Sequence, residues 1–418
     1  MNAPLDELAD HRRFATVPPP LAVRHLLFDV CEAHDLKANG LYNVARQLTA
    51  EQSAAAVDAK IVFLREEGRD LSKEPIDVPL QVIDLAGRKL RGRRIGIAGE
   101  VLNAITAGAN AGAIFHIHAA RQPMLIPIVL RLRRLGIPYA MTVHGRYSHL
   151  FDADNRATRL LPALYLQLVE RRILEGALFV QGVSAAECEV IRRIAPSARV
   201  ELAPNAAYSS RFDGVPQLPA RRAPTARFPV FGFLGRYEMQ HKGLDLLISG
   251  FAAFAREGGK GVLELVGTGP QRADITALAR DLRIANRVTV DGPRFGQDKL
   301  DTLKGWDYFV MPSRFEGVPI GAIEAGLHGL PLIVSAGTGL RQQVADSKAG
   351  IGIDALTAAG VARAFHRAQC ARDAWCAMSS AAHQMALSIG DWTSIAARLV
   401  SLYGQRAAAP GTSRQVGR

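Results

Sequence analysis

The chain has 418 residues, of which 48% are hydrophobic and 22% charged, a composition typical of a soluble globular protein. This length suggests two or three domains. With 51 Lys and Arg against 39 Asp and Glu, the formal net charge is +12, which favours anionic partners: nucleotide phosphates, an acidic membrane surface or nucleic acid.

The cysteines and the apolar stretches indicate where the protein works. Its four cysteines, Cys31, Cys188, Cys370 and Cys376, form no C-x-x-C pair and have no zinc-finger spacing, so we expect reduced thiols in a reducing cytoplasm. The first residues are acidic without an apolar run, unlike a signal peptide. The apolar stretch 124–130 is too short to span a bilayer. We therefore expect a cytoplasmic protein, with any membrane contact peripheral, on the inner face of the cytoplasmic membrane.

Regular structure is expected to begin after a flexible N-terminal arm, residues 1–20, because three consecutive prolines end that stretch. Apolar runs then recur with helical patterns between most of them. This alternation is typical of a parallel sheet with right-handed crossovers. The predicted strands of this half cover residues 25–31, 60–64, 78–85, 113–118, 139–143, 178–181 and 199–203.

Glycine and histidine residues follow several of these strands. Gly40 lies in the loop after the first strand, where it would let the backbone approach a ligand, although an ordinary turn explains it equally well. His118 and His144 come at the ends of later strands, and ligands of doubly wound sheets bind beyond those ends. For His116 and His118 a structural hydrogen-bonding role is the favoured alternative.

A second domain is predicted after a linker rich in Pro, Ala and Arg, residues 208–229, because the strand and helix pattern restarts there. Arg236 and Lys242 flank the turn between its first strand and helix. Together they could stabilise the negative charge that develops on a departing diphosphate. Two surface cations beside a helix start are the alternative reading.

The segment 311–329, MPSRFEGVPIGAIEAGLHG, reads as a strand end, a loop and a helix. Pro319 suits the first helical turn, and Gly329 is placed to end the helix in the left-handed conformation. The N–H groups of the helix start suit a phosphate. Glu316 and Glu324, in E-x7-E spacing, could hold sugar and ribose hydroxyls, although two solvated glutamates would be the ordinary reading of so short a pattern.

These segments together resemble family 4 retaining glycosyltransferases. The resemblance rests on the segment above, on GRYEMQHKGLDLLI from Gly235 and on LGIPYAMTVHG ending at Gly145; it covers roughly residues 26–403 and is most specific over 235–340. It implies an α/β GT-B fold, with two doubly wound Rossmann-like domains facing across a cleft. The implied parts are an acceptor-binding domain (21–207), the linker (208–229), a nucleotide-sugar domain (230–385), a helix that packs back on the first domain (386–403) and a disordered tail (404–418).

The resemblance also implies roles for individual residues. Glu316 would contact the transferred sugar, Glu324 the ribose, and Arg236 and Lys242 the diphosphate, with His144 hydrogen-bonded to the donor sugar. Glu316, His144, Arg236 and Lys242 are thus the expected catalytic residues. Further expected donor contacts are Gly317, Val318, Pro319, Ile320, Gly267 and Pro293, and Gly40 and His118 are expected on the acceptor side.

The resulting expectation is a retaining, metal-independent glycosyltransferase, of hexosyltransferase type, that needs no cofactor. Its partners would be a nucleoside-diphosphate sugar, a saccharide or lipid-linked acceptor of bacterial surface polysaccharide or glycan synthesis, and an anionic membrane surface. A GT-B-fold epimerase or phosphorylase is the alternative. A non-catalytic nucleotide or nucleic-acid binder is a third reading, but only 6% of residues are aromatic and none interleave with basic clusters, so no nucleic-acid partner is expected.

Overall fold

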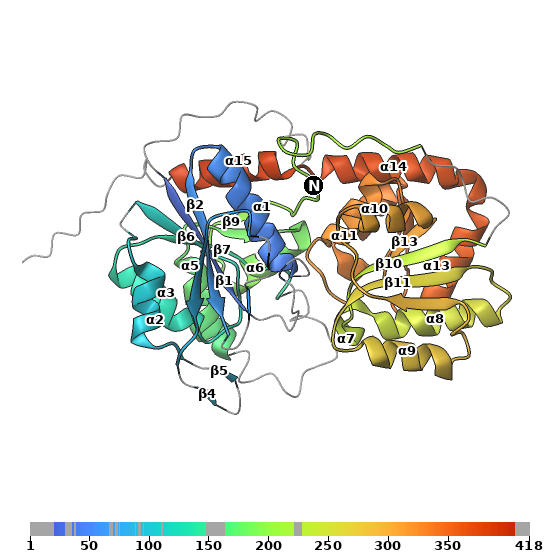
Figure 1. Ribbon diagram of the computed structural model, residues 1–418, viewed down its shortest axis with the longest axis horizontal. Helices are drawn as coiled ribbons and strands as arrows, with labels where there is room; N and C mark the ends of the chain where they lie inside the picture. Colours follow the sequence, from blue (N-terminus) through green and yellow to red (C-terminus); the bar gives the residue numbers. More distant parts are fainter. Residues whose placement is uncertain are drawn as a thin grey trace, which may run out of the picture.

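The chain folds into two α/β lobes that lie side by side (Figure 1). This computed structural model describes residues 21–29, 36, 39–66, 70–71, 74, 76–87, 89–90, 93–94, 96–109, 112–147, 164–220 and 228–405. Each lobe is built on a parallel sheet, as the alternating pattern predicts. The expected pair of α/β domains built on parallel sheets is therefore confirmed.

The first lobe contains a seven-stranded parallel sheet in the order β3-β2-β1-β6-β7-β8-β9. All strands predicted for this half are present, with shifted ends; the first begins at Ala22. The strands are β1 (Ala22–Phe28), β2 (Asp58–Arg65), β3 (Leu80–Asp84), β6 (Ala113–Ile117), β7 (Tyr139–Thr142), β8 (Val180–Gly182) and β9 (Val200–Leu202). A two-stranded antiparallel ribbon, β4 (Lys89–Leu90) and β5 (Arg93–Arg94), lies in the basic stretch between β3 and the next helix.

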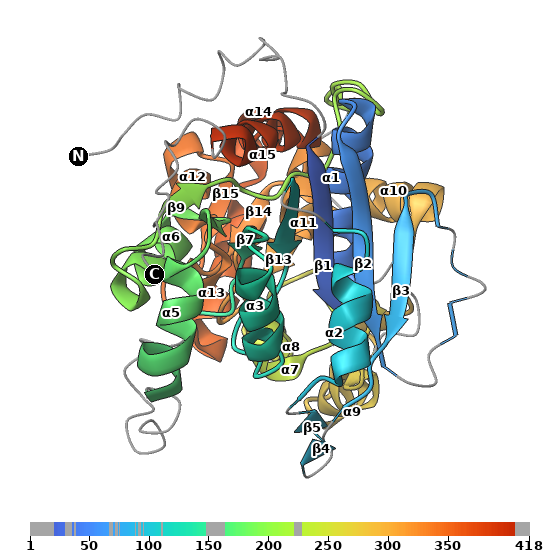
Figure 2. The same cartoon turned by 90° about the vertical axis from the view of Figure 1, so that its left-hand side faces the viewer.

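Helices cover both faces of this sheet (Figure 2). Alternate strand residues face opposite sides, so Ile114 packs with the α1 side while Phe115 packs with the α3 side. The helices of this lobe are α1 (Gly40–Ala54), α2 (Gly99–Thr106), α3 (Leu125–Arg134), the π-helix η3 (Leu166–Glu170), α5 (Arg171–Glu175) and α6 (Ala185–Ile194).

The second lobe contains a six-stranded parallel sheet in the order β12-β11-β10-β13-β14-β15. Its strands are β10 (Val230–Arg236), β11 (Val262–Thr268), β12 (Val288–Asp291), β13 (Tyr308–Met311), β14 (Leu332–Val334) and β15 (Gly350–Gly352). Its helices are α7 (Met239–Lys242), α8 (Leu244–Arg256), α9 (Arg272–Asp281), α10 (Gly296–Gly305), α11 (Ile320–Leu327), η4 (Ala336–Thr338), α12 (Arg341–Ser347), α13 (Ala358–Cys370), η5 (Arg372–Ala374) and α14 (Trp375–Ser388).

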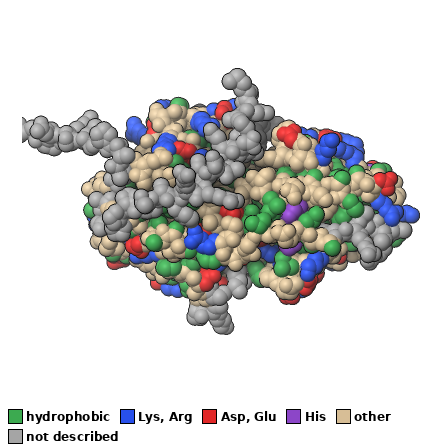
Figure 3. Space-filling model, turned by 90° about the horizontal axis from the view of Figure 1, so that it is seen from above, with side chains coloured by type: hydrophobic (Ala, Val, Ile, Leu, Met, Phe, Trp, Pro, Cys, Tyr) green, Lys and Arg blue, Asp and Glu red, His purple; other side chains and the backbone are tan. Residues whose placement is uncertain are grey.

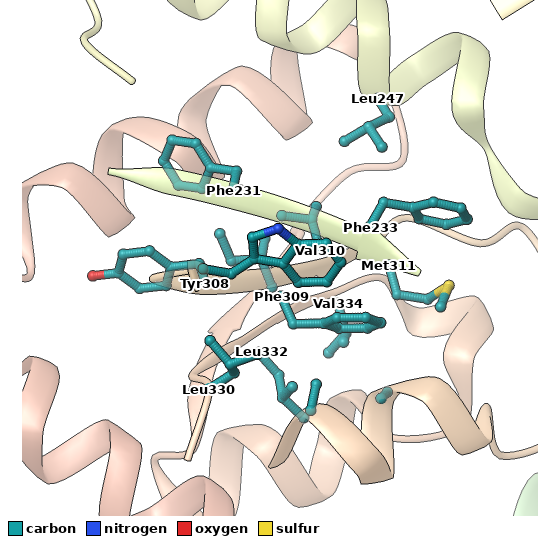
Figure 4. Packing of buried hydrophobic residues seen from close by; sticks show 14 of the residues in the cluster. Phe231, Phe233, Leu247, Tyr308, Phe309, Val310, Met311, Leu330, Leu332 and Val334 are labelled. Carbon is teal, nitrogen blue, oxygen red and sulfur yellow. The ribbon is translucent and has the colours of Figure 1, made fainter. Parts of the chain in front are cut away.

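The core of the second lobe is centred on β13, every residue of which is buried. Figure 4 shows Phe309, Leu332 and Val334 below β10, and Phe231, Phe233 and Leu247 above it. Because both faces of β13 are covered, its sequence is a continuous apolar run and not an alternating one. This rigid strand fixes the position of the loop that follows it, residues 312–319.

The last helix leaves the second lobe and packs on the first (Figure 1). Helix α15 (Trp392–Gly404) buries Trp392, Leu399 and Tyr403 in one apolar cluster with Val44 of α1 and Phe179 of the first lobe. The helix begins later than residue 386, because residues 386–388 still belong to α14. The predicted N-terminal arm and nearly all of the predicted tail lie outside the described residues.

On the face seen in Figure 3, the Lys and Arg side chains of the described residues are interspersed with Asp and Glu. Among the described residues, no helix combines the length and the hydrophobicity needed to span a bilayer.

Candidate active site

The end of β10, the loop after it and helix α7 carry a row of hydrogen-bonded and ion-paired side chains. Arg236 Nε lies 3.1 Å from Glu238 Oε1, and Glu238 Oε2 lies 2.8 Å from His241 Nδ1. His241 Nε2 is 3.4 Å from Glu316 Oε1, to which Lys242 Nζ donates a hydrogen bond. Burial alone would raise the pKa of Glu238, but His241 and Arg236 bring it below its usual range. Arg236, Lys242 and Glu316 therefore belong to one continuous network.

Glu316 reaches this network because the loop after β13 is tied to α7 and α8. Arg314 forms a bidentate ion pair with Asp245, at 2.7 and 2.6 Å, and its backbone N–H donates to the carbonyl of His241 at 3.0 Å. The Phe315 ring stacks on His241, with centroids 4.6 Å apart. Sequence reasoning missed Arg314 and Asp245, because nothing in either segment indicates which acid meets which base.

Helix α11 starts beside this network. Pro319 is the residue before the helix, whereas the sequence placed it in the first turn; its carbonyl accepts from Ala322 and Ile323. The N–H groups of Ile320 and Gly321 precede these first helical hydrogen bonds, as expected of an anion-binding helix start. Gly329 has a φ of 67°, so the predicted left-handed end of this helix is confirmed.

The first lobe contacts the loop before this helix through the turn formed by His144 and Gly145. Both have left-handed backbone conformations, with φ of 50° and 76°. A Cβ on Gly145 would lie 2.8 Å from the backbone nitrogen of Gly317, so the two lobes meet here main chain to main chain. Only glycine permits this approach.

Glu187 holds the His144–Gly145 turn from behind. Its buried carboxylate accepts hydrogen bonds from the N–H groups of Gly145 and Val183, the latter at 2.7 Å. Ser184 caps α6 by accepting from the Glu187 N–H at 3.1 Å, which is one half of a capping box. The Glu187 carboxylate does not accept from the backbone N–H of Ser184, however, because it accepts from Gly145 and Val183 instead. Burial raises the pKa of Glu187 to about 6.

His144 is also the outer member of a row of histidines. His118 Nδ1 lies 3.0 Å from His144 Nε2, and His118 Nε2 lies 2.9 Å from His25 Nδ1. His25 Nε2 in turn lies 2.9 Å from Gln52 Oε1 of helix α1. The structure thus places His118 directly behind His144. Sequence reasoning missed His25 and Gln52, although pairing β1 with β6 in the register that opposes His25 to His116 would have revealed the cluster.

A third arginine, which the sequence did not single out, faces the same space from the first lobe. Partial desolvation and the positive charges of Arg236 and Arg121 lower the pKa of Arg146. Arg146 follows the His144–Gly145 turn directly, while Arg236 belongs to the second lobe. Positive charge from both lobes therefore converges where they meet, which suits an anionic group such as a diphosphate.

Two family descriptions match this chain over most of its length. Residues 9–206 match the glycosyl transferase 4-like domain, and residues 228–369 match glycosyl transferases group 1. The chain belongs to the group 1, family 4-like glycosyltransferases. The resemblance on which the site assignment rests is thereby confirmed for both lobes.

Relatives of this glycosyltransferase family act on different sugars. The chain is 29% identical over 243 residues to the GDP-mannose-dependent alpha-(1-6)-phosphatidylinositol monomannoside mannosyltransferase of Mycobacterium tuberculosis, covering 55% of this chain and 63% of that protein. It is 27% identical over 213 residues to the 2-deoxystreptamine glucosyltransferase of Streptomyces kanamyceticus, covering 49% and 54%. The match thus spans less than two thirds of either relative.

The solved structure of sucrose-phosphate synthase from Thermosynechococcus elongatus has the same fold. Its TM-score is 0.73 at 22% sequence identity, over 93% of this chain and 99% of that one. At this identity the likeness establishes the GT-B fold and leaves the substrate to other arguments.

Glu324, the second acid of the glycosyltransferase motif, stands apart from the charge network. It lies on α11 and its Oε1 accepts from Lys299 Nζ of α10 at 2.7 Å. Both side chains are partly buried, at 21% and 27% exposure. The ion pair ties the carboxylate to α10, and its expected contact with a ribose stays a prediction.

The structure shows the surroundings of three further residues that are expected to contact a ligand: Gly267, Gly40 and Pro293. A Cβ on Gly267 would lie 1.8 Å from the carbonyl oxygen of Gly235, so the pairing of β11 with β10 already requires this glycine. Gly40 is exposed at the start of α1, which Asn39 caps by accepting from Leu41 N at 3.0 Å. Pro293 is exposed after β12. Their contacts with donor or acceptor stay predictions.

A metal could in principle be bound by His25, His116 and His118, whose ring nitrogens come within 4.8 Å of one another. The nitrogens are nevertheless engaged elsewhere. His116 bonds to Tyr403 through Nδ1 and to Thr142 through Nε2 at 2.6 Å, while His25 and His118 bond to each other. Hydrogen bonding thus accounts for the cluster, and the expected independence from metal stays a prediction.

Proposed function

We propose that this protein is a retaining glycosyltransferase that moves a sugar, most simply a hexose, from a nucleoside-diphosphate sugar to a hydroxyl of an acceptor. The observation that carries the proposal is the continuous network of Arg236, Lys242 and Glu316 beside the start of α11, at the point where Gly145 of the other lobe touches Gly317. Separated in sequence, these groups meet at one interdomain site.

The chemistry follows from the charges. When the bond between the anomeric carbon and the phosphate oxygen breaks, negative charge grows on the diphosphate, and Arg236, Lys242 and the N–H groups of Ile320 and Gly321 would stabilise it. The acceptor oxygen bonds to the anomeric carbon from the same face, and its proton passes to the departing phosphate oxygen. This route needs neither a protein nucleophile nor a metal, and the configuration at the anomeric carbon is retained.

Donor binding would exchange the partners within the network. A diphosphate competes with Glu316 for Lys242 and with Glu238 for Arg236, because each cation can form charge-assisted hydrogen bonds with phosphate oxygens. Glu316, once released from Lys242, could accept hydrogen bonds from the hydroxyls of the transferred sugar. His144 would contact the same sugar from the opposite lobe.

The acceptor is assigned to the first lobe, whose sheet ends beside His118 and His144. The two relatives are named for a phosphatidylinositol mannoside and for 2-deoxystreptamine as acceptors. We infer a saccharide or lipid-linked acceptor in bacterial surface polysaccharide or glycan synthesis. Such an acceptor would place the protein in the cytoplasm and, where the acceptor is lipid-linked, at the inner face of the membrane.

A thermal-shift screen with UDP-, GDP- and ADP-sugars tests the donor site. We expect one nucleotide class to raise the Tm of the wild type, a much smaller shift in Lys242→Ala and a reduced shift in Glu316→Ala. Lys304→Ala is the matched control, because Lys304 pairs with Asp301 on the exposed side of α10. Equal shifts in all four proteins would refute the site.

Product analysis separates the proposed transfer from related activities. NMR of the product formed from an α-linked donor should show an α-glycoside in the presence of an acceptor. Release of free nucleotide and an altered free sugar, independent of any acceptor, would instead favour a GT-B-fold epimerase, and transfer to inorganic phosphate would favour a phosphorylase.

A further inference from the structure

Behind His144 lies a buried row of hydrogen-bonded side chains, Gln52, His25, His118 and His144, which we call the histidine chain. The three inner members are fully buried, and only His144 is partly exposed. Burial lowers the pKa of His25 to about 4 and, together with Arg146, that of His144 to about 3. Burial and the neighbouring histidines also hold the pKa of His118 well below its usual range, so all three imidazoles are neutral near pH 7.

A chain of neutral imidazoles has a direction. Each ring carries one N–H donor and one bare acceptor nitrogen, so fixing the proton on the first ring fixes it on every other. Gln52 Oε1 accepts from His25 Nε2, which leaves His25 Nδ1 to accept from His118 Nε2. His118 Nδ1 must then accept from His144 Nε2. His144 is left with a bare Nδ1.

The orientation of the Gln52 amide is supported by a second set of hydrogen bonds that starts at a backbone carbonyl. Gln181 Nε2 donates to the carbonyl of Ala203 at 2.8 Å, so its Oε1 accepts from Thr142. The Thr142 oxygen accepts from His116 Nε2 at 2.6 Å, so His116 Nδ1 accepts a hydrogen bond from the Tyr403 hydroxyl.

The Tyr403 hydroxyl uses its only proton in the hydrogen bond to His116, so toward any other partner its oxygen can only accept. Burial raises the pKa of Tyr403, and the Gln52 side chain acts in the opposite direction, as an N–H group near the phenol oxygen would. Within normal hydrogen-bond limits the Gln52 Nε2 has no partner among the described residues, so this contact is a loose one. It still favours Nε2 toward Tyr403 and Oε1 toward His25.

We propose that Gln52, His25 and His118 are positioning residues that fix His144 as the tautomer with a bare Nδ1, which accepts a hydrogen bond from a hydroxyl of the transferred sugar. Among the described residues the His144 Nδ1 has no hydrogen-bond partner, and the adjacent Gly145 lies against Gly317 of the donor lobe. This inference rests on the proposed function, because it takes a sugar to be bound between the lobes.

The first test is the tautomer itself, which needs no substrate. In wild-type protein labelled with ¹⁵N-histidine, long-range ¹H–¹⁵N spectra at pH 7.5 should show the proton on Nε2 of His25, His118 and His144. Single histidine substitutions assign the signals. A proton on Nδ1 of His144 would overturn the proposal, whatever happens to any variant. Loss of these signals on adding Zn²⁺ or Co²⁺ would also overturn it, in favour of a metal site.

The second test removes the Gln52 acceptor, which fixes the tautomers of the histidine chain. Gln52→Met keeps the size of the side chain but removes the acceptor, so the His144 ¹⁵N shifts should move to values intermediate between the two tautomers. Thr49→Val is the matched control, because Thr49 is equally buried on the same helix and its hydroxyl has no partner among the described residues. Unchanged His144 shifts in a folded Gln52→Met protein would contradict the proposal.

Kinetics then connect the tautomer with the sugar. Loss of one neutral hydrogen bond should raise the donor KM roughly three- to tenfold in Gln52→Met. The Kd of the nucleoside diphosphate without its sugar should stay within about twofold, since the histidine chain does not touch the diphosphate network. An equal weakening of both would indicate a merely structural role. If no donor binds to the wild type at all, the proposed function fails, while the tautomer measurement still stands.

Discussion

At the residue scale, the exposure of each cation indicates how readily it can change partners. The Arg236 and Glu238 side chains are 39% and 30% exposed, and such solvent-exposed ion pairs contribute little to stability. Lys242 and Glu316 are each 13% exposed, so their interaction is less screened. A diphosphate would therefore engage Arg236 first at little cost, and Lys242 would follow as the lobes exclude water.

Buried neutral histidines make the first lobe sensitive to acid. The pKa of His25 is near 4 in the folded protein and about 6.5 in the unfolded chain, because burial disfavours the charged ring. The unfolded chain thus binds protons first, and folding stability falls as the pH drops from 6.5 to 4. For His25 alone the loss amounts to about 3 kcal/mol. Urea-unfolding free energies measured between pH 7.5 and 4.5 should show this decline.

A variant isolates the contribution of His25 to this pH dependence. His25→Phe should lose less free energy between pH 6.5 and 4.5 than the wild type, and parallel curves would contradict the assignment. Glu187 acts in the opposite direction in both proteins. Its pKa, raised to about 6 by burial, makes its ionised form cost stability above pH 6, and this cost disappears as the pH falls toward 4.5.

At the element scale, the turn between α7 and α8 decides where Lys242 points. Gly243 ends α7 and precedes α8 with a φ of 65°. A Cβ there would lie 2.1 Å from the carbonyl oxygen of Pro312, in the loop that carries Glu316. Together with the Arg314–Asp245 pair, this close approach brings Lys242 to Glu316.

Gly243→Ala should therefore disturb both stability and the donor site. Strain at positive φ costs of order 1–3 kcal/mol, and the overlap with Pro312 adds to it. Urea unfolding should show a loss of roughly 2–4 kcal/mol, and the donor-induced Tm shift should fall.

Gly214→Ala is the control, because Gly214 has a φ of 71° but an added Cβ would meet nothing within 4 Å. We expect a loss of roughly 1 kcal/mol and an unchanged donor shift. If the two variants behaved alike, the approach of Gly243 to Pro312 would have no consequence for the site.

At the scale of the whole molecule, α15 ties the two lobes together. The backbone N–H of Trp392 donates to the carbonyl of Tyr208 at 3.0 Å, and the Trp392 side chain, 3% exposed, packs in the cluster that covers α1 and the first sheet. Helix α15 thus completes the core of the lobe that contains β1 and α1. Tyr403 of the same helix reaches His116 in that core.

Trp392→Ala should consequently destabilise the first lobe, although the residue follows the second in sequence. Truncating a buried tryptophan costs about 3–5 kcal/mol, and the loss should appear in urea unfolding. Leu168→Ala, at a residue 56% exposed in the first lobe, should change stability by no more than about 0.5 kcal/mol. If Trp392→Ala lowered the free energy of unfolding as little as Leu168→Ala, the packing of α15 would not stabilise the first lobe.

The sequence alone determined the two doubly wound lobes, the family and the local geometry of the α11 segment. Those depend on short-range patterns: apolar runs flanked by helical periodicity, and Gly329 at a helix end. Arg236 and Lys242 of the second lobe could also be proposed from sequence, since their motif is local, although their roles toward a donor stay predictions.

Only the tertiary structure decided which distant residues meet. Arg314 pairs with Asp245, Glu187 accepts from Gly145, and His25 and Gln52 form hydrogen bonds in a row with His118 and His144. Strand register and helix packing set these contacts, and no local sequence pattern indicates them. Sequence spacing limits which side chains share a face of a strand or a helix. The partner that each face meets depends on the packing of the whole chain. The histidine chain therefore depends on the pairing of β1 with β6, which the sequence does not show.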